Sequence, residues 1–518
     1  MTKYGLTPVC DCTLQDLLTQ KNLARFLARL CRQSGDWQSW DETPWQHPWL
    51  TSTNLRSVKE YSRNFLEKEK RILNHVDPKK FEIGFCGNIA NTMYVRAVPL
   101  RRAGLNIEIY LSPQDEYVMS RPGWEEFDGS ISNPAKAIEE LKKNGTQLPE
   151  IPGVHQYPMH TDWKTRYASS GLKFLRRSDI KNFSTYLPYI ETLIALQEKD
   201  VLWATQVPYL AYLANRPNVV SQMGGDLWFE ASRGDELGAL MRRSFRCARL
   251  NLASNPWTFA HARRFNMSNV IYLPKIIDQN VYSPGHGQAR RRWEVESGGN
   301  FFVLTSSRID ERNKGSMVGL EGFAEFSRSV PNARLVFIGW GKGLADLDRR
   351  LLDLGIMDKV IRLPVSGKAG IRDILRSADV SFDQFVLGYY GSAGMEAMAC
   401  GLPVIARNES DQYDALCETG GPPILNASMP AEVAKHLSRL HADSQRRMEV
   451  ADASRKWFVA NHGSERWLPE ITAVLAATAL GRPANMRANP LTRPHSIQER
   501  IYHLKNWLAA PPYPNYGY

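Results

Sequence analysis

Three short segments in the second half of the chain carry residues whose types and spacing suit the binding of an anion. The first begins as a strand that ends at Asp383, continues as a loop with Gly388 and Gly391, and becomes a helix near Ser392. Glycines let a backbone approach a ligand closely, and N–H groups at the start of a helix attract negative charge. This segment therefore predicts a phosphate-binding turn at residues 391–394.

Glu396 is the unusual residue of that helix. Its neighbours on both sides are methionine, alanine and cysteine, so it is a lone carboxylate in an apolar run. A buried carboxylate needs hydrogen-bond partners. Two interpretations remain open at this point, because either the hydroxyl groups of a ligand or the backbone of a neighbouring loop would satisfy it.

The second and third segments also end strands. Arg308 and Lys314 are six positions apart around a short loop after one strand, and charge-assisted contacts from such cations suit a diphosphate. Alone, they would be read as a solvated basic turn, but together with the glycine turn they predict a clamp. The run IGWGKG, which contains Gly339, lacks the third glycine of a dinucleotide fingerprint and indicates only a tight turn beside a ligand.

Two series of alternating strands and helices position these segments. The first starts at Phe81, where an apolar run leads into a glycine turn, a helix from Thr92 and a second strand at 105–111. The second series follows residues 284–300, which are read as an interdomain connector. The pattern predicts an α/β protein with two doubly wound, Rossmann-like domains. Such sheets bind ligands at the carboxyl ends of their strands, so a cleft between the two domains is expected.

Composition and charge narrow the function classes. The chain has 518 residues, is 43% hydrophobic, and carries 65 basic and 54 acidic residues, a surplus of +11. These values exclude a disordered, collagen-like or disulfide-scaffold protein, and the surplus favours anionic partners. Seven scattered cysteines predict a reducing compartment. The sequence shows no signal peptide and no run of about 18 apolar residues, so a cytoplasmic protein is expected.

Three pieces together resemble a known family. They are the turn from Arg308 to Gly315, the block from Glu396 to Ile405, and the segment 273–284. They are similar to those of the retaining, nucleotide-sugar-dependent glycosyltransferases of family four, which have the GT-B fold. The resemblance is close over residues 270–440 and loose over 81–270. The domains then expected are a helical N-terminal extension (1–80), an acceptor domain (81–284), a nucleotide-sugar donor domain (285–475), and a C-terminal helix and tail (476–518).

The resemblance implies a reaction and roles. A sugar would move from a nucleoside diphosphate to a glycan or lipid-linked acceptor, with retention at the anomeric carbon and with no metal or cofactor. The catalytic residues expected are Arg308, Lys314, Glu396 and Asp226. Arg308 and Lys314 would bind the diphosphate, and Glu396 would accept hydrogen bonds from the ribose. The donor-binding residues expected are Gly339, Arg362, Leu363, Asp383, Gly388, Gly391, Ser392, Ala393 and Glu396.

One position departs from the family pattern. The family usually places another glutamate eight positions before the one matched by Glu396, where it reaches the donor sugar. Here that position is Gly388. The resemblance leaves the sugar contact without a residue, and Asp383 and Gln384, at the end of the preceding strand, are the expected substitutes. Donor-sugar identity and activity both depend on this position.

The acceptor side is expected in the first domain. Gly87 and Asn88 in the first strand–helix turn, and Gly225 with Asp226 after a later strand, are the candidates; the simpler interpretation of Asp226 is a helix cap. Arg242, Arg246 and Arg249 form a basic stripe on a predicted helix. It suits either an ordinary solvated face or a peripheral contact with an anionic membrane at its inner face.

Two other functions are alternatives to sugar transfer. A nucleotide-sugar epimerase needs acid and base groups around the sugar, and no convincing carboxylate–histidine group is evident. A non-catalytic nucleotide-sugar-binding partner subunit fits Gly388 but not the joint presence of Arg308, Lys314 and Glu396. No sequence motif supports binding to nucleic acid.

Overall fold

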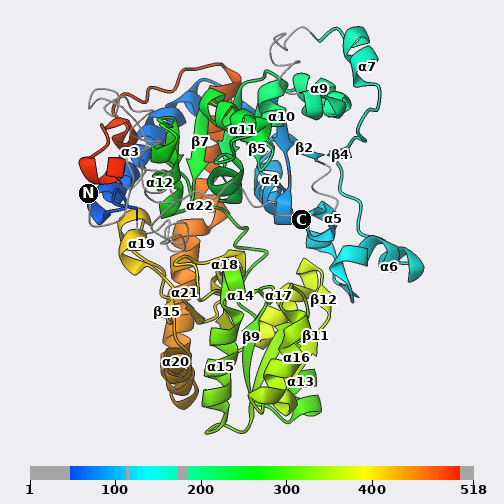
Figure 1. Ribbon diagram of the computed structural model, residues 1–518, viewed down its shortest axis with the longest axis vertical. Coiled ribbons are helices and arrows are strands. Elements are labelled where there is room, and N and C mark those ends of the chain that lie inside the picture. The colour runs from blue at the N-terminus through cyan, green and yellow to red at the C-terminus, as the bar shows by residue number, and fades with distance from the viewer. Residues whose placement is uncertain (1–46, 113–116, 173–183, 223, 502–518) are drawn as a thin grey trace, which may run out of the picture.

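The computed structural model describes residues 47–112, 117–172, 184–222 and 224–501 and shows two α/β lobes, one above the other in Figure 1. The first lobe contains a parallel seven-stranded sheet in the order β4-β2-β1-β5-β6-β7-β8. Its strands are β1 (Glu82–Cys86), β2 (Asn106–Leu111), β4 (Val154–Gln156), β5 (Val201–Thr205), β6 (Asn218–Ser221), β7 (Leu250–Ala253) and β8 (Val270–Tyr272).

The second lobe contains a parallel six-stranded sheet in the order β11-β10-β9-β13-β14-β15. Its strands are β9 (Phe301–Thr305), β10 (Ala333–Ile338), β11 (Val360–Leu363), β13 (Val380–Phe382), β14 (Val404–Ala406) and β15 (Leu425–Asn426). Most of these strands are unbroken apolar runs, because helices cover both faces of a parallel sheet. The predicted pair of doubly wound domains is confirmed.

Helices surround both sheets. Those between the strands of the first lobe are α4 (Thr92–Arg102), α5 (Pro122–Glu126), α6 (Ala137–Lys143), α7 (Trp163–Ser169), α9 (Ile190–Gln197), α10 (Pro208–Leu213), α11 (Glu236–Cys247) and α12 (Pro256–Arg264). Those of the second lobe are α13 (Ala289–Ser297), α14 (Glu311–Lys314), α15 (Ser316–Ser327), α16 (Leu344–Asp353), α17 (Lys368–Ser377), α18 (Ser392–Ala399), α19 (Ser410–Leu416), α20 (Pro430–Ala442) and α21 (Ser444–His462).

The chain crosses between the lobes twice, and the two crossings touch. Residues 273–284 lead from β8 into the second lobe, and α21 leads back to α22 (Ser464–Ala479) (Figure 1). Ile277 of the first crossing donates its N–H to the carbonyl of His462 at 3.1 Å and accepts from Ser464 at 3.2 Å. Helix α22 then packs on α4 and β5 of the first lobe. The change of lobe therefore falls at Gly463, whereas the sequence placed a boundary at residue 475.

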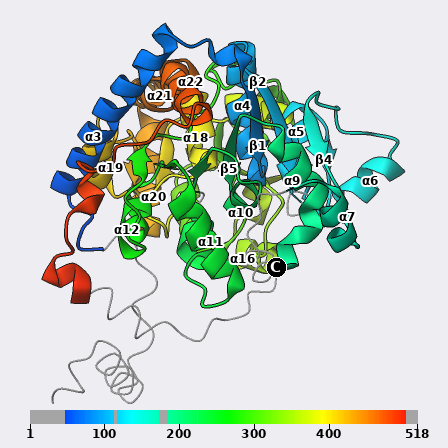
Figure 2. The same cartoon turned by 90° about the horizontal axis from the view of Figure 1, so that it is seen from above.

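Two other segments differ from the expectation. The helix α3 (Ser52–Lys70) packs on β8 and α22, so this part of the expected extension is built into the first lobe (Figure 2). Residues 284–300 are not a simple connector, because they contain α13, whose Trp293 is fully buried against the second sheet. Its arginines concealed this helix, since only Ala289 and Trp293 of α13 are buried. Residues 1–46 and 502–518 lie outside the described residues.

One segment of the first lobe belongs to the core of the second. Residues 118–141, here called the docking segment, bury Trp124, Phe127 and Ile131 in the same apolar cluster as the second sheet. The short strand β3 (Ser130–Ile131) pairs antiparallel with β12 (Val365–Ser366), and Gly367 donates its N–H to Gly129 at 2.9 Å. Figure 1 shows α5 and α6 beside β12 at the junction of the lobes. The docking segment thus ties the two lobes together.

This contact makes a stability prediction. A Cβ atom added at Gly367 would lie 2.1 Å from the carbonyl oxygen of Phe127, so Gly367→Ala must displace the docking segment. We expect it to lower the free energy of unfolding by about 1–3 kcal/mol and to expose residues 118–141 to limited proteolysis. Gly370→Ala is the matched control, because its Cβ atom would meet Asp128 at 3.3 Å. Equal melting temperatures and equal cleavage of the two variants would contradict the prediction.

Candidate functional site

The buried carboxylate of Asp383, at the end of β13, organises the candidate site. Its side chain is fully buried and accepts hydrogen bonds from the hydroxyl of Ser307, at 3.2 Å, and from the N–H of Gly391. A Cβ atom at Gly394 would lie 2.7 Å from the same carboxylate. Asp383 therefore joins the end of β9 to the start of α18, and it needs a glycine in the first turn of that helix.

Lys314 brings a cation to the same place. Its ammonium donates to Gln384 Oε1 at 2.7 Å and lies 3.7 Å from Asp383. A Cβ atom added at Gly391 would be 3.2 Å from this ammonium, so Lys314 stands at the N-terminus of α18. The first N–H groups of a helix have no acceptor within the helix. Ammonium and helix terminus together form a site suited to an anion.

Arg308 lies on the turn that precedes Lys314. Its guanidinium donates to Asp310 at 2.9 Å and is 44% exposed. Ile309, the next residue, donates its N–H to Trp340 and accepts from Gly343. Gly341 has a φ of +116°, and a Cβ atom there would lie 2.3 Å from the Ile309 carbonyl oxygen. The run IGWGKG is therefore a tight turn that supports the arginine.

A second lysine at this helix terminus comes from the first crossing. The ammonium of Lys275 donates to Ser392 Oγ at 2.7 Å. Burial and the nearby Arg96 lower the pKa of Lys275 to about 8. The sequence analysis missed this residue, although Lys275 lies in the segment 273–284, one of the three pieces that resemble the family.

The partner of Glu396 is neither of the two that the sequence left open. Both carboxylate oxygens accept hydrogen bonds from the ammonium of Lys368, at 2.6 and 2.7 Å, at the start of α17. Glu125 of the docking segment lies beside this pair, where burial and Glu396 raise its pKa and Lys368 lowers it, and it accepts from the Tyr282 hydroxyl at 2.8 Å. Burial alone would lower the pKa of Lys368, but Glu396 and Glu125 raise it above the ordinary value. Lys368 and Glu125 are the other residues that the sequence analysis missed.

Two of the predicted donor-binding residues have partners elsewhere. The Arg362 guanidinium forms an ion pair with Asp348 of α16 and lies 5.2 Å from the Phe337 ring centroid. Leu363 is buried, and its carbonyl accepts from Gly339 at 2.9 Å, which joins the ends of β10 and β11. Their place at the end of β11 fits the expectation, but no contact connects them to Glu396.

The contacts of Asn88 and Gly87, two of the predicted acceptor-side residues, stabilise the local structure. The Asn88 carboxamide accepts from Met93 and Tyr94 at 3.1 and 2.9 Å and donates to Asn91 and Ser120, so it holds the start of α4. Gly87 has a φ of +77°, and a Cβ atom there would lie 2.4 Å from the Thr205 carbonyl. The hydrogen bonds of the Asn88 carboxamide thus hold the start of α4, and an acceptor-side role for Gly87 and Asn88 stays a prediction.

The other acceptor-side candidates follow β6. Asp226 is buried and its carboxylate accepts at 2.9 Å from the N–H of Leu227, in a π-helical turn (Asp226–Glu230) whose N-cap residue, Gly225, gives no side-chain cap. Gly225, just before it, is exposed. Burial, followed by the charge of Asp226, raises the pKa of Glu230 to about 7.

Comparison with known proteins agrees with this geometry. Residues 288–457 match the family model described as glycosyl transferases group 1. The match covers the second lobe from α13 almost to the end of α21. A D-inositol 3-phosphate glycosyltransferase from Segniliparus rotundus is 27% identical over 224 residues, which are 42% of this chain and 40% of the relative. An alpha-monoglucosyldiacylglycerol synthase from Acholeplasma laidlawii is 31% identical over 144 residues, 28% of this chain and 35% of the relative. The chain thus spans less than half the length of these relatives.

Solved structures extend the likeness to both lobes. HepE from Anabaena, in complex with UDP and glucose, aligns with a TM-score of 0.54 at 16% identity over 77% of this chain and all of that one. Sucrose-phosphate synthase from Thermosynechococcus elongatus aligns with a TM-score of 0.51 at 15% identity over 78% of this chain and 99% of that one. At such identities the likeness concerns the fold, and the chain has the GT-B arrangement of two lobes.

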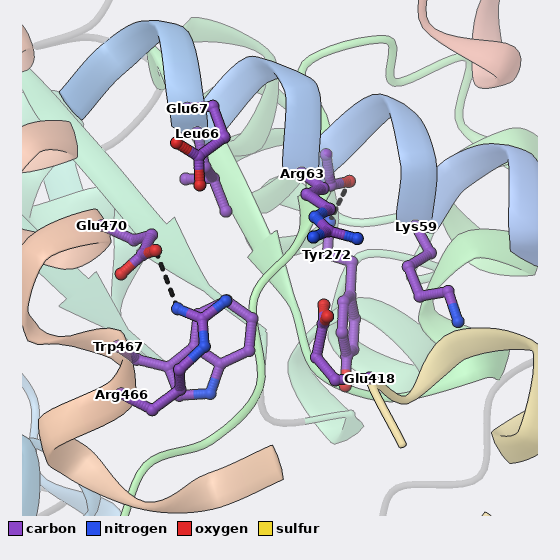
Figure 3. A pocket seen from close by; sticks show the side chains of 10 residues that line it. Lys59, Arg63, Leu66, Glu67, Tyr272, Glu418, Arg466, Trp467 and Glu470 are labelled. Carbon is purple, nitrogen blue, oxygen red and sulfur yellow. Dashed lines mark hydrogen bonds and ion pairs between the residues drawn. The ribbon is translucent and has the colours of Figure 1, made fainter. Parts of the chain in front are cut away.

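A separate pocket lies between α3, α22 and Glu418 (Figure 3). Two of its charged groups pair, since Arg466 donates to the buried Glu470 at 2.8 Å, and Lys70, which lies outside the lining, donates to the same carboxylate at 3.1 Å. None of its lining residues belongs to the anion site at α18. The pocket lies where α3 and α22 meet Glu418 of the second lobe.

Other expectations concern the surface. Arg242 and Arg246 of α11 donate to backbone carbonyls, and Arg249 forms an ion pair with Glu69 at 2.6 Å, so the basic stripe is engaged within the protein. Among the described residues, no helix combines the length and apolarity needed to cross a bilayer. The same residues contain no cluster of three or more potential metal-ligating side chains.

The pairing of Lys368 and Glu396 makes a second prediction. Lys368→Met leaves two neighbouring carboxylates, Glu396 and Glu125, without their cation, so we expect a loss of about 1–3 kcal/mol in the free energy of unfolding. Lys368→Met combined with Glu396→Gln should recover most of that loss. Urea unfolding of the two single variants and the double variant measures the coupling energy, with exposed Lys435→Met as control. Additive effects would show that the two side chains do not interact.

His462 makes a third prediction, on acid stability. The ring is buried between the Tyr390 hydroxyl, at 2.8 Å, and the Lys275 carbonyl, at 2.6 Å, and burial lowers its pKa from 6.5 to about 4. Between pH 6.5 and 4 the unfolded chain binds the extra proton, so stability falls as the pH falls. From pH 7 to 5 this group should cost about 2 kcal/mol.

The matching variant is His462→Gln. It should be less stable than the wild-type protein at pH 7 but should lose less stability between pH 7 and 5, as urea unfolding at both values would show. An equal loss in the two proteins would assign the acid sensitivity to other groups.

Proposed function

We propose that the protein is a retaining glycosyltransferase that moves a sugar from a nucleoside diphosphate to a hydroxyl group of an acceptor. The observation that carries this is the meeting of Lys275 and Lys314, from different segments, at the N-terminus of α18, one turn before Glu396. Two cations and a helix terminus suit a diphosphate, and a carboxylate one turn further suits the ribose hydroxyls.

The proposed chemistry follows from the charges. The bond between the anomeric carbon and the diphosphate oxygen breaks, a bond to the acceptor oxygen forms on the same face, and the hydroxyl proton leaves with the diphosphate. Negative charge therefore grows on the leaving diphosphate, next to Lys314 and Arg308. Fixed cations aimed at that position stabilise the transition state. We propose that they do so in place of a divalent metal ion.

Several observations bear on the substrates. HepE holds UDP and glucose in one crystal and UDP-glucose in another, which supports a nucleotide-sugar donor. The relatives named above are called after an inositol phosphate and a glucosylated diacylglycerol, so acceptors differ within the family. We propose a glycan or lipid-linked acceptor, used by an enzyme of surface-glycan synthesis in the cytoplasm at the inner face of the membrane. The surplus of +11 supports an anionic partner, although Arg242 and Arg246 of α11 already donate to backbone carbonyls of the protein.

A thermal-shift panel tests the donor site. We expect one of UDP, GDP or ADP, or one of their sugars, to raise the melting temperature by a few degrees at saturating concentration, because a ligand that binds only the folded state stabilises it. Lys314→Ala should abolish this shift, whereas Lys435→Ala on the exposed face of α20 should keep it.

Two results would change the proposal. If no nucleotide or nucleotide sugar shifts the wild-type protein, the proposal is wrong. If they bind but no sugar is transferred to any acceptor or to water, the chain is a nucleotide-sugar-binding subunit instead.

A further inference from the structure

We propose that Glu409 is the carboxylate that contacts the donor sugar and selects it. This inference rests on the proposed function. Glu409 follows β14 and lies outside the segments that the sequence analysis singled out. Four observations around the loop that follows β13 support this assignment.

The side chain of Glu409 fills the place of a missing one. A Cβ atom added at Gly388 would lie 2.2 Å from Glu409 Cγ and 2.9 Å from its Oε1 atom. The Glu409 N–H also donates to the Gly388 carbonyl at 2.9 Å, which fixes the two backbones side by side. Gly388 has no positive φ, so the backbone itself would accept a side chain there. Glu409 is what excludes it.

The Glu409 carboxylate makes few contacts with the other described residues. It occupies the N-cap position of α19 but makes no capping hydrogen bond to that helix. Among the residues that the structure describes, its ion pair is with Arg407, which lies 3.2 Å from Oε1. Within the part of the chain that the structure describes, no donor reaches its Oε2 atom, and 36% of its side chain is exposed. A polar atom in this state is available to a ligand hydroxyl.

The carboxylate stands beside the anion site. Arg407 donates its N–H to the carbonyl of Gln384 at 2.9 Å, and Gln384 holds the Lys314 ammonium through its side chain. The loop that follows β13 thus contacts Glu409 at Gly388 and, at Gln384, the cation that is proposed to bind the diphosphate. The sugar of a nucleotide sugar is bonded directly to that diphosphate, so its hydroxyl groups fall within reach of this loop.

The two residues expected from the sequence to contact the sugar have other partners. Asp383 accepts from Ser307 and Gly391 and faces Lys314, with its side chain fully buried. Gln384 uses its oxygen for Lys314 and its amide N–H for the Tyr389 carbonyl. Neither is available without breaking the anion site. Glu409 is the acidic group at this loop whose second oxygen remains available.

The test compares two affinities in each variant by calorimetry. One ligand is the nucleotide that shifts the melting temperature in the panel of UDP, GDP and ADP, and the other is the tightest-binding sugar of that nucleotide. Because Glu409 contacts only the sugar, Glu409→Gln should weaken the nucleotide sugar about tenfold relative to the nucleotide, as the loss of a charge-assisted hydrogen bond does. Asp411→Asn, an equal charge change on the exposed face of α19, should leave the ratio unchanged.

A second variant distinguishes the loss of the carboxylate from a local rearrangement of the protein. Glu409→Gly combined with Gly388→Glu moves the carboxylate across the contact, and we expect it to restore most of the ratio that Glu409→Gly alone loses. A Glu409→Gln ratio equal to that of the wild-type protein would overturn the inference while leaving the proposed function intact. If no nucleotide binds the wild-type protein, the proposed function fails and this inference falls with it.

Discussion

The buried charge of Asp383 is the constraint on which the rest of the site depends. An ionised group taken out of water must be matched by donors and opposite charge, and here Ser307, Gly391 and Lys314 supply them. Those partners come from the end of β9, the start of α18 and the end of α14. Satisfying one carboxylate therefore brings a cation and a helix terminus to the same point, which is the arrangement an anionic ligand needs.

The two lobes are interlocked as well as juxtaposed. The chain crosses between them at residues 273–284 and at Gly463, and the docking segment inserts its aromatic side chains into the second lobe. Two of these connections reach the site, since Lys275 donates to Ser392 and Glu125 lies beside Lys368. Any change in the relative position of the lobes must therefore alter the charges around α18.

The site is built from paired opposite charges. Lys368 and Glu396, Lys314 and Asp383, and Arg407 and Glu409 each place a cation against a carboxylate within 3.7 Å. Such pairs hold both groups in a fixed orientation, because moving either one leaves the other without its partner. A nucleotide sugar would then meet oriented charges and would need little rearrangement of the protein.

Local patterns in the sequence predicted a large part of this protein. The alternation of apolar strands and helices predicted two doubly wound domains, and the structure confirms them, because that periodicity is written residue by residue. The turn from Arg308 to Lys314 and the glycines around Gly391 were visible for the same reason. By contrast, the sequence did not reveal α13, because only Ala289 and Trp293 of this helix are buried and its apolar pattern is therefore weak.

Only the tertiary structure decided which groups meet. Lys368 and Glu396 are 28 positions apart, and Lys275 and Ser392 are 117 apart. Their contacts exist because α17 packs near α18 and because the chain crosses between lobes at that point. The same holds for Glu409, which reaches Gly388 from the neighbouring strand. The sequence by itself determined most strands and helices and the glycine turn, because their signals are local, whereas packing over long separations decided that Glu396 pairs with Lys368 and that Glu409 lies against Gly388.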